Sequence, residues 1–294
     1  MDFSLDIKRL KKTFDKVAQH YDHVAVLQRQ IADSMLTRMD VMTITPKTIL
    51  EIGSATAYAS RQLEKKFKKA QVFSLDFSAN MLKQAKKQKK FFSKQQFVLA
   101  DANRLPFKDN SMDMIFSNLL LHWLDDINSS MKEWQRVLKP EGVLMFSCFG
   151  PDTLQELRQS FTAIDDAPHV HQFLDMHDIG DAVFHAGFVN PVFDVEYFQL
   201  TYKNLKQLFK ELKQSGYQNQ EKQRHKGLMG KEAFAKLQKA YKHYVIEDNV
   251  YPASYEIIYG HGWGSEKQMH KQVDVSEHTI PISNIRRGKR PSGI

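Results

Sequence analysis

The chain has 294 residues, of which 42% are hydrophobic, and Cys148 is its only cysteine. This size allows one large globular domain or one domain with a substantial insertion, and a lone cysteine excludes an internal disulfide and a multi-cysteine metal site. No apolar run reaches the roughly eighteen residues of a membrane span, and the first eight residues lack the apolar core of a signal peptide. We therefore expect a cytoplasmic protein with no membrane partner and no metal.

The net charge of +8 is unevenly distributed along the chain. Residues 201–244 contain eleven Lys or Arg and three Glu, an excess equal to that of the whole sequence. Concentrated positive charge attracts acidic partners, either a nucleic acid or an acidic protein. A lysine-rich helix that is simply solvated would have the same composition, so charge alone leaves both interpretations open.

The first predicted elements are a helix over residues 8–40 and a buried strand that begins at Thr48. Apolar residues recur at helical spacings between Phe14 and Leu36, and Ile49, Leu50 and Ile52 form the short apolar run typical of a parallel strand. Gly53 and a predicted helix from about residue 58 follow this strand. A strand, glycine turn and helix place free backbone N–H groups where a nucleotide-like ligand can bind.

Asp76 stands at the end of the next predicted strand, 72–75, where a carboxylate can hold the two hydroxyls of a ribose. The glycine turn and this carboxylate would suit NAD and S-adenosylmethionine equally well. A predicted helix over 77–94 follows. Further strands are predicted at 97–102, in the segment that ends at Phe116, and at 143–149.

This succession of elements resembles the class I S-adenosylmethionine-dependent methyltransferases across about residues 45–150. The resemblance implies an α/β fold with a Rossmann-like central sheet, flanking helices, an N-terminal covering helix and a helical lid inserted before the last strands. It also implies S-adenosylmethionine as cofactor and S-adenosylhomocysteine as product. The implied cofactor-binding residues are Glu51, Gly53, Ser54 and Ala55 near the methionine part, Asp76 and Phe77 at the ribose, Asp101 and Ala102 at the adenine, and Asn118 in the pocket.

The first turn departs from the family pattern, which has three alternating glycines where this chain has Gly53, Ala55 and Ala57. If an alanine must adopt a left-handed backbone there, its Cβ costs roughly 1–2 kcal/mol. We expect a working site with weakened cofactor binding, and a non-catalytic homologue that only binds the cofactor is an alternative.

Tyr21 and His122 are the candidate catalytic residues. In small-molecule methyltransferases of this class a helix such as the one containing Tyr21 covers the cofactor, and an aromatic face there attracts the sulfonium cation. His122 could act as a base, although a lone histidine beside Trp123 is more often structural. Residues 117–126 lack the Pro-Pro-aromatic motif of base-methylating enzymes, so we expect no nucleic-acid partner.

Four segments narrow the resemblance: Phe14–Arg29, Phe146–Arg158, Phe173–Phe188 and Pro252–Gly264. Together they are similar to the malonyl-[acyl-carrier-protein] O-methyltransferase family of biotin synthesis. That family methylates the free carboxylate of a malonyl thioester, malonyl-carrier protein or malonyl-CoA, and the methyl ester starts pimeloyl synthesis. A sister group related to the arginine-modifying assembly factor of respiratory complex I is the alternative.

We divide the chain into an N-terminal helical cover (1–44), a cofactor-binding core (45–200), a basic helical lid (201–250), and a final strand with a basic tail (251–294). The resemblance implies an acidic acyl carrier protein as partner, and we expect the enzyme to be a monomer. Lys206, Lys210, Lys213 and Arg224 are the candidate residues for binding the substrate or carrier. A malonyl carboxylate is already ionised at neutral pH, so this reaction requires no general base.

Overall fold

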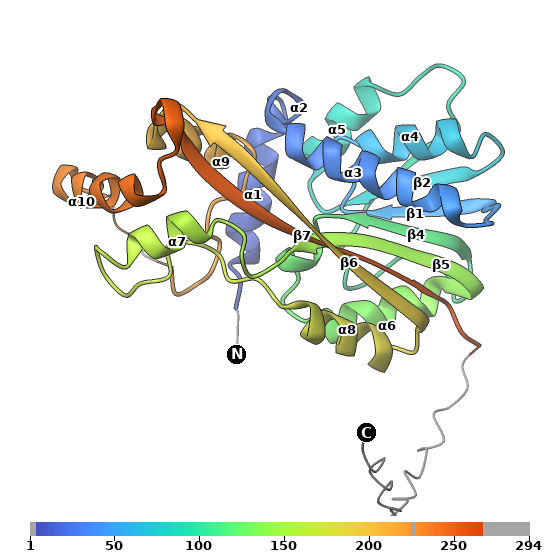
Figure 1. Cartoon of the computed structure of the whole chain (residues 1–294). Helices are drawn as coiled ribbons and strands as arrows, with labels where there is room; N and C mark the ends of the chain where they lie inside the picture. The colour runs from blue at the N-terminus through green and yellow to red at the C-terminus, as the bar shows by residue number, and fades with distance from the viewer. Residues whose placement is uncertain (1–3, 225–226, 228, 267–294) are drawn as a thin grey trace, which may run out of the picture.

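A seven-stranded sheet with helices on both faces forms the centre of the molecule (Figure 1). The computed structural model describes residues 4–224, 227 and 229–266. The strand order is β3-β2-β1-β4-β5-β7-β6, in which β1 to β5 run parallel and β7 runs antiparallel to both of its neighbours. The strands are β1 (Thr48–Ile52), β2 (Gln71–Asp76), β3 (Gln96–Leu99), β4 (Met112–Asn118), β5 (Leu138–Phe149), β6 (Val189–Tyr202) and β7 (Tyr251–Trp263). This arrangement confirms the predicted methyltransferase-type sheet.

Alternating side chains of β1 divide the core into two layers. Ile49 joins an apolar cluster with residues of α3 and α4, whereas Leu50 and Ile52 join a second cluster with residues of α6 and α8. Burial on both faces explains the continuous apolar run of this strand. The helices are α1 (Ile7–Val17), α2 (Tyr21–Val24), α3 (Val26–Arg38), α4 (Tyr58–Lys66), α5 (Ala79–Lys87), α6 (Ile127–Val137), α7 (Gln155–Phe161), α8 (Met176–His185), α9 (Leu205–Gln214) and α10 (Lys231–Tyr241).

The predicted helix over residues 8–40 is three helices, because a turn separates Val17 from Tyr21 and the backbone leaves the helical region again at Ala25, with a ψ of 45°. The separate α1 packs against α5 and contributes Leu10 and Phe14 to a third apolar cluster. The predicted helix over 77–94 was also too long, since α5 ends at Lys87. Like charges three or four residues apart in the lysine-rich run that follows disfavour a longer helix.

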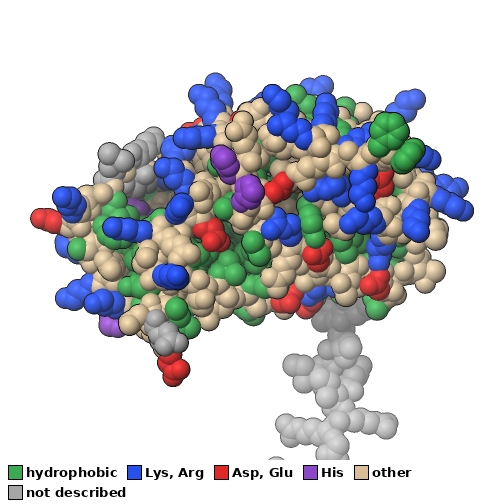
Figure 2. All heavy atoms as spheres, turned by 90° about the horizontal axis from the view of Figure 1, so that it is seen from above, with side chains coloured by type: hydrophobic (Ala, Val, Ile, Leu, Met, Phe, Trp, Pro, Cys, Tyr) green, Lys and Arg blue, Asp and Glu red, His purple; other side chains and the backbone are tan. Residues whose placement is uncertain are grey.

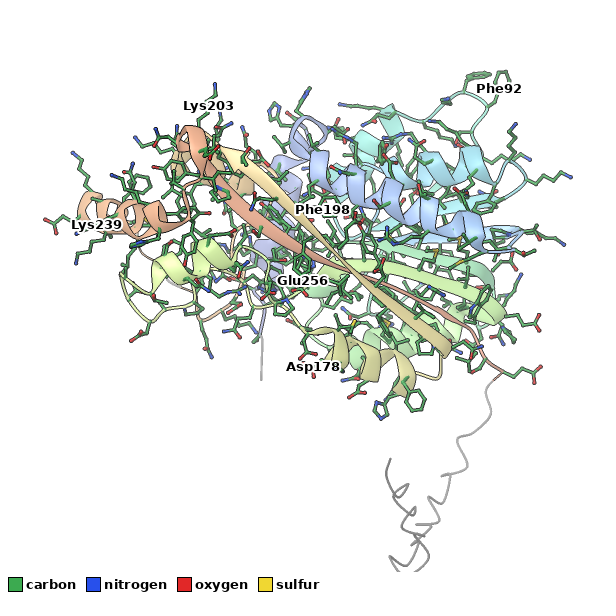
Figure 3. All side chains as sticks on the ribbon, viewed as in Figure 1. Phe92, Asp178, Phe198, Lys203, Lys239 and Glu256 are labelled. Atoms are coloured by element: carbon green, nitrogen blue, oxygen red, sulfur yellow. The ribbon has the colours of Figure 1, made fainter. Side chains whose placement is uncertain are left out.

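The basic segment forms α9 and α10, which lie in the chain between β6 and β7, so the lid precedes only the last strand. Leu205, Leu208 and Leu212 form the buried stripe of α9. At the outer edge of this region Lys203 and Lys239 point into solvent (Figure 3). The predicted basic tail falls mostly beyond residue 266, outside the described residues.

The N-terminal segment is joined to the loop after α9 by backbone hydrogen bonds. The amide of Asp6 donates to the carbonyl of Gln220 at 2.9 Å, and the amide of Lys222 donates to the carbonyl of Ser4 at 3.0 Å. An antiparallel bridge pairs Leu5 with Glu221. The beginning of α1 is therefore fixed to the lid region although more than two hundred residues separate them in the sequence.

Candidate active site

The turn after β1 has a left-handed backbone at three alternating positions. The φ angles are 75° at Gly53, 45° at Ala55 and 60° at Ala57, which is the N-cap residue of α4. The amides of Gly53 and Ser54 both donate to the carbonyl of Leu75 at 2.9 Å, and these bonds hold the turn against β2. Both alanines thus occupy the conformation that favours glycine, at roughly 1–2 kcal/mol each.

Two buried carboxylates stand beside this turn. The Asp76 side chain accepts hydrogen bonds from the amides of Ala55 and Ser78, each at 2.8 Å. Burial nevertheless raises the pKa of Asp76 to about 6. Burial also raises the pKa of Glu51 to about 7, although its carboxylate accepts hydrogen bonds from the amide and hydroxyl of Ser60. Both groups carry a desolvation cost that a cationic or hydroxyl-bearing ligand would offset.

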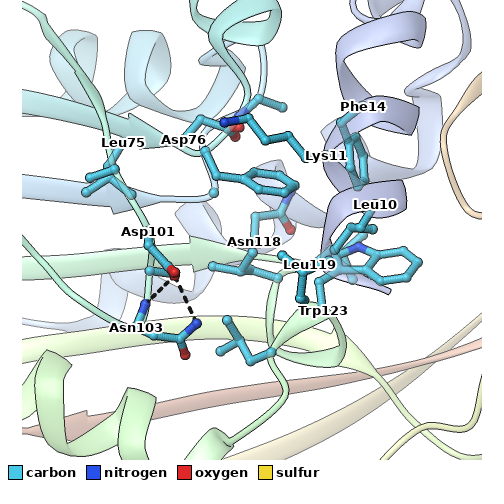
Figure 4. A pocket seen from close by; sticks show the side chains of 18 of the residues that line it. Leu10, Lys11, Phe14, Leu75, Asp76, Asp101, Asn103, Asn118, Leu119 and Trp123 are labelled. Carbon is cyan, nitrogen blue, oxygen red and sulfur yellow. Dashed lines mark hydrogen bonds between the residues drawn. The ribbon is translucent and has the colours of Figure 1, made fainter. Parts of the chain in front are cut away.

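A cavity of about 510 Å³ opens at the carboxyl ends of β1, β2 and β4 (Figure 4). Its described lining includes three carboxylates, those of Asp76, Asp101 and Asp125, and one cationic side chain, Lys11. Asp101 accepts hydrogen bonds from the amide and side-chain nitrogens of Asn103, both at 2.9 Å. We call this space the first cavity, and its charge favours a cationic ligand.

The first cavity brings together most of the predicted cofactor residues. Those that line it are Gly53, Ala55, Asp76, Phe77, Asp101, Ala102 and Asn118. Glu51 and Ser54 instead line a recess of about 40 Å³ that shares Gly53, Ala55 and Asn118 with it. The Ser54 hydroxyl in this recess is buried and has no hydrogen-bond partner in the described structure.

Sequence reasoning missed several residues of the first cavity, including Leu10, Phe14, Trp123 and Tyr217. The ring of Phe14 meets those of Phe77 and Trp123 edge-on, with centroids 6.1 and 6.0 Å apart. Helical spacing indicated that Phe14 would be buried, but not which cavity it would line. Nothing local in the sequence distinguishes Tyr217, which comes from the loop after α9.

The two candidate catalytic residues have different positions. Tyr21 lines the first cavity, and burial, with the neighbouring Tyr217 and Asp76, raises the pKa of its phenol well above the usual value. His122 is not among the lining residues and lies among aromatic rings, 4.8 Å from Trp123 and 4.9 Å from Phe149 between centroids. Burial lowers the pKa of His122 far below its usual range, and neither ring nitrogen has a hydrogen-bond partner in the described structure. His122 is therefore a neutral packing residue in this geometry.

A second cavity, of about 550 Å³, adjoins the first. Trp123 and Tyr217 line both spaces, and their ring centroids are 5.7 Å apart. The cationic side chains of the second cavity are Arg9, Lys213 and Arg224, and no Asp or Glu occurs among the described residues that line it. Its remaining wall is largely apolar, formed by residues such as Phe149, Leu154, Leu157, Phe161, Val170, Phe173, Phe209, Leu212 and Met229.

The four candidate lid residues therefore fall into two groups. Lys213 and Arg224 line the second cavity, whereas Lys206 and Lys210 are exposed on the outer face of α9. Lys and Arg side chains lie over the lid and also over the opposite end of the molecule (Figure 2). Surface charge alone does not single out the lid, but the second cavity distinguishes two of its cations from the rest.

Comparison with known proteins identifies the family. Residues 50–146 match the model of a methyltransferase domain. The chain is 38% identical to the malonyl-[acyl-carrier protein] O-methyltransferase of Halorhodospira halophila over 98% of both chains. It is 42% identical to the protein of that name from Gallionella capsiferriformans, over 89% of this chain and 92% of that one. The chain belongs to the malonyl-[acyl-carrier protein] O-methyltransferases.

Family membership confirms the narrower resemblance and favours it over the arginine-modifying alternative. Among solved structures, the YcgJ protein of Bacillus subtilis matches with a TM-score of 0.55 and 14% identity, over 80% of this chain and 99% of that one. Phosphoethanolamine N-methyltransferase 2 of Haemonchus contortus, solved with S-adenosyl-L-methionine, matches with a TM-score of 0.53 and 21% identity, over 86% and 57% of the two chains. At these identities both structures support the fold alone.

The described residues contain no cluster of three or more His, Cys, Asp or Glu side chains that could hold a metal ion. Over the same part of the chain, no helix has the length and apolarity needed to cross a membrane.

Proposed function

We propose that this member of the malonyl-[acyl-carrier protein] O-methyltransferases transfers a methyl group from S-adenosylmethionine to the free carboxylate of a malonyl thioester. The substrate is malonyl-carrier protein or malonyl-CoA, and the product is its methyl ester. The observation that carries this proposal is the pair of adjoining cavities, one acidic and one basic, that share Trp123 and Tyr217. A cationic cofactor suits the first cavity and an anionic substrate suits the second.

The residues of the first cavity fit S-adenosylmethionine. Asp76 offers a carboxylate for the ribose hydroxyls, beside Phe77. The recess offers the carboxylate of Glu51 and the unpartnered hydroxyl of Ser54 to the polar groups of the methionine part, next to Gly53 and Ala55. We assign the adenine to the side of Asp101 and Ala102, and Asn118 to the wall between the methionine part and the substrate.

When bound, S-adenosylmethionine supplies an electrophilic methyl group next to a sulfonium cation. The malonyl carboxylate is already ionised at neutral pH, so no side chain has to remove a proton. This agrees with a neutral, unpartnered His122. Tyr21 contributes an aromatic face that attracts a cation, and its phenol stays protonated because burial raises its pKa.

Alignment and exclusion of water are the main contributions of the protein. The rings of Phe14, Trp123 and Tyr217 give the first cavity a predominantly apolar wall, where the attraction between carboxylate and sulfonium is stronger than in water. Holding the two reactants in adjoining cavities converts a bimolecular displacement into an effectively unimolecular one. A monomeric state and a cytoplasmic location stay predictions.

The test is methyl transfer from methyl-labelled S-adenosylmethionine to malonyl-carrier protein, followed by mass analysis of the thioester. Acetyl-carrier protein, which has no free carboxylate, is the matched control. We expect one methyl group on the malonyl substrate and none on the control. Absence of transfer to every malonyl thioester by a protein that binds the cofactor would overturn the proposal in favour of a non-catalytic binder.

A further inference from the structure

Arg224 lies in the wall of the second cavity with an incomplete set of partners. Its side chain is 10% exposed, and its Nε is buried with no hydrogen-bond partner in the described structure. One terminal nitrogen donates to the carbonyl of Glu221 at 2.8 Å, and the nearest ion-pairing oxygen, on Asp6, is 3.8 Å from the other. A buried guanidinium with an unused donor is costly unless a ligand completes its hydrogen bonds.

Arg9 reaches the same cavity from α1. Burial and the positive charge of Arg224 both lower the pKa of Arg9, whereas the carboxylate of Asp6 raises it. Asp6 also caps α1 by accepting a hydrogen bond from the amide of Arg9, and its own amide is bonded to Gln220 in the loop that leads to Arg224. The fold thus holds two guanidinium groups near one another with one carboxylate between them, an arrangement that favours an added anion.

The rest of the second cavity suits a slender, mainly apolar chain with a few amides. Aromatic and aliphatic side chains dominate its wall, and Gln218 supplies a polar group. The side chains of Thr153 and Asn219 also line it but are hydrogen-bonded to the backbone of Glu256 and of Pro168 and Glu221. Its volume of about 550 Å³ lies in the range of roughly 300–1,000 Å³ usual for small-molecule sites. The second cavity adjoins the proposed methyl-transfer site at Trp123 and Tyr217. Arg9 and Arg224 line the second cavity but not the first.

We propose that Arg9 and Arg224 bind the 4′-phosphate of the phosphopantetheine arm that carries the malonyl group, with the arm lying in the second cavity. This inference rests on the proposed function. It specifies which group of the substrate the two arginines bind, namely the phosphate of the arm. Arginine is suited to phosphate because its planar guanidinium donates two parallel hydrogen bonds. Carrier protein and coenzyme A both contain the 4′-phosphate of this arm, as a phosphodiester in the carrier protein and as half of a diphosphate in coenzyme A, so the arginines recognise what the two substrates share.

The experiment compares two substrates that differ only in the phosphate: malonyl-4′-phosphopantetheine and malonyl-pantetheine. We expect the wild-type KM to be roughly ten- to a hundredfold lower for the first, the range of one charge-assisted hydrogen bond. Arg9→Gln and Arg224→Gln should raise the KM of the phosphorylated substrate toward that of the other. Their KM for malonyl-pantetheine and their kcat on both substrates should stay within about twofold.

Two further variants keep the result decisive. Lys8→Gln changes an exposed cation on the same helix that is not among the residues lining the second cavity, and it should leave both KM values unchanged. Arg224→Lys keeps the charge and should restore part of the preference for phosphate. The inference is overturned if the wild-type enzyme methylates both substrates with equal KM. It is also overturned if the folded arginine variants lose activity equally on the phosphorylated and the unphosphorylated substrate.

Malonyl-CoA and malonyl-carrier protein distinguish the two sources of the 4′-phosphate. An equal rise in KM for both substrates supports recognition of the shared arm. A rise confined to malonyl-carrier protein would mean that the arginines contact the carrier's surface, and the inference would fail. Absence of methyl transfer from the wild-type enzyme to any malonyl thioester would overturn the proposed function instead, so the two failures are distinguishable.

Discussion

Asp76 should make S-adenosylmethionine binding depend on pH near pH 6. Burial raises its pKa to about 6 in the unliganded protein, and each carboxylate oxygen already accepts one backbone amide at 2.8 Å. The remaining lone pairs are available to the ribose hydroxyls. Those donors favour the ionised form, so binding lowers the pKa of Asp76 and releases a proton at lower pH.

The size of the effect follows from the fraction of Asp76 that is ionised. At about pH 5, one unit below its pKa of about 6, roughly a tenth of the carboxylate is ionised, and the dissociation constant should be about tenfold larger than at pH 8. Asp76→Asn should weaken binding at pH 8 by at least roughly tenfold, because a charge-assisted hydrogen bond contributes about 1.5–3 kcal/mol. In this variant the transition near pH 6 should be absent, and only the change that Glu51 contributes near pH 7 should remain.

Calorimetric titration between pH 5 and 8, in two buffers of different ionisation enthalpy, measures both the affinity and the released protons. Burial raises the pKa of Glu51 to about 7, so Glu51→Gln is the control that separates a second transition near that pH. If folded Asp76→Asn binds as tightly as the wild type at pH 8, or if adding Asp76→Asn to Glu51→Gln leaves the slope of affinity against pH below pH 6 unchanged, the assignment of Asp76 is wrong.

Three other predictions concern the turn, the buried histidine and the lid. Ala55→Gly should raise the free energy of unfolding by roughly 0.5 kcal/mol, measured by chemical denaturation, because relief at φ 45° outweighs the entropy that glycine adds to the unfolded chain. The fully buried methyl of Ala57 contributes about 0.8 kcal/mol, so Ala57→Gly should leave stability nearly unchanged. His122→Phe should leave the pH profile of kcat unaltered. If the variant lost the acidic side of that profile, His122 would have to be a general base after all. Lys206→Glu with Lys210→Glu should raise KM for malonyl-carrier protein but not for malonyl-pantetheine, with added salt imitating the change in the wild type; equal losses on both substrates would exclude carrier docking there.

The gathering of most predicted cofactor residues around the first cavity was largely predictable, because its signals are local. The apolar run before Gly53 and the acidic residue after the next strand each lie within a few residues of the backbone feature they indicate. The sequence could not show whether Ala55 and Ala57 are strained, because it does not give their φ angles. The structure places both positions in the left-handed region.

The substrate side was predictable only in part. The second cavity is formed by distant segments, among them Arg9 in α1, Trp123 after β4 and Tyr217 after α9. No periodicity or motif relates residues so far apart, and only tertiary packing brings them together. For the same reason the sequence could not separate Lys213 and Arg224 from the exposed Lys206, or show that Trp123 and its aromatic neighbours enclose the ring of His122.

The backbone pairing of Ser4 and Asp6 with the loop after α9 bears on the order of events during turnover. Leu10 and Phe14 of α1 line the first cavity, and Arg9 of the same helix lines the second. Because Asp6 is hydrogen-bonded to Gln220 and Ser4 to Lys222, the beginning of α1 is held against the loop that contributes Tyr217 and Arg224 to the second cavity. If the arm enters the second cavity as we propose, a movement that admits it is expected to loosen the cover above the first cavity as well. Binding and release of the ligands of the two cavities would then be kinetically coupled. S-adenosylhomocysteine is expected to leave the first cavity only when the arm leaves the second.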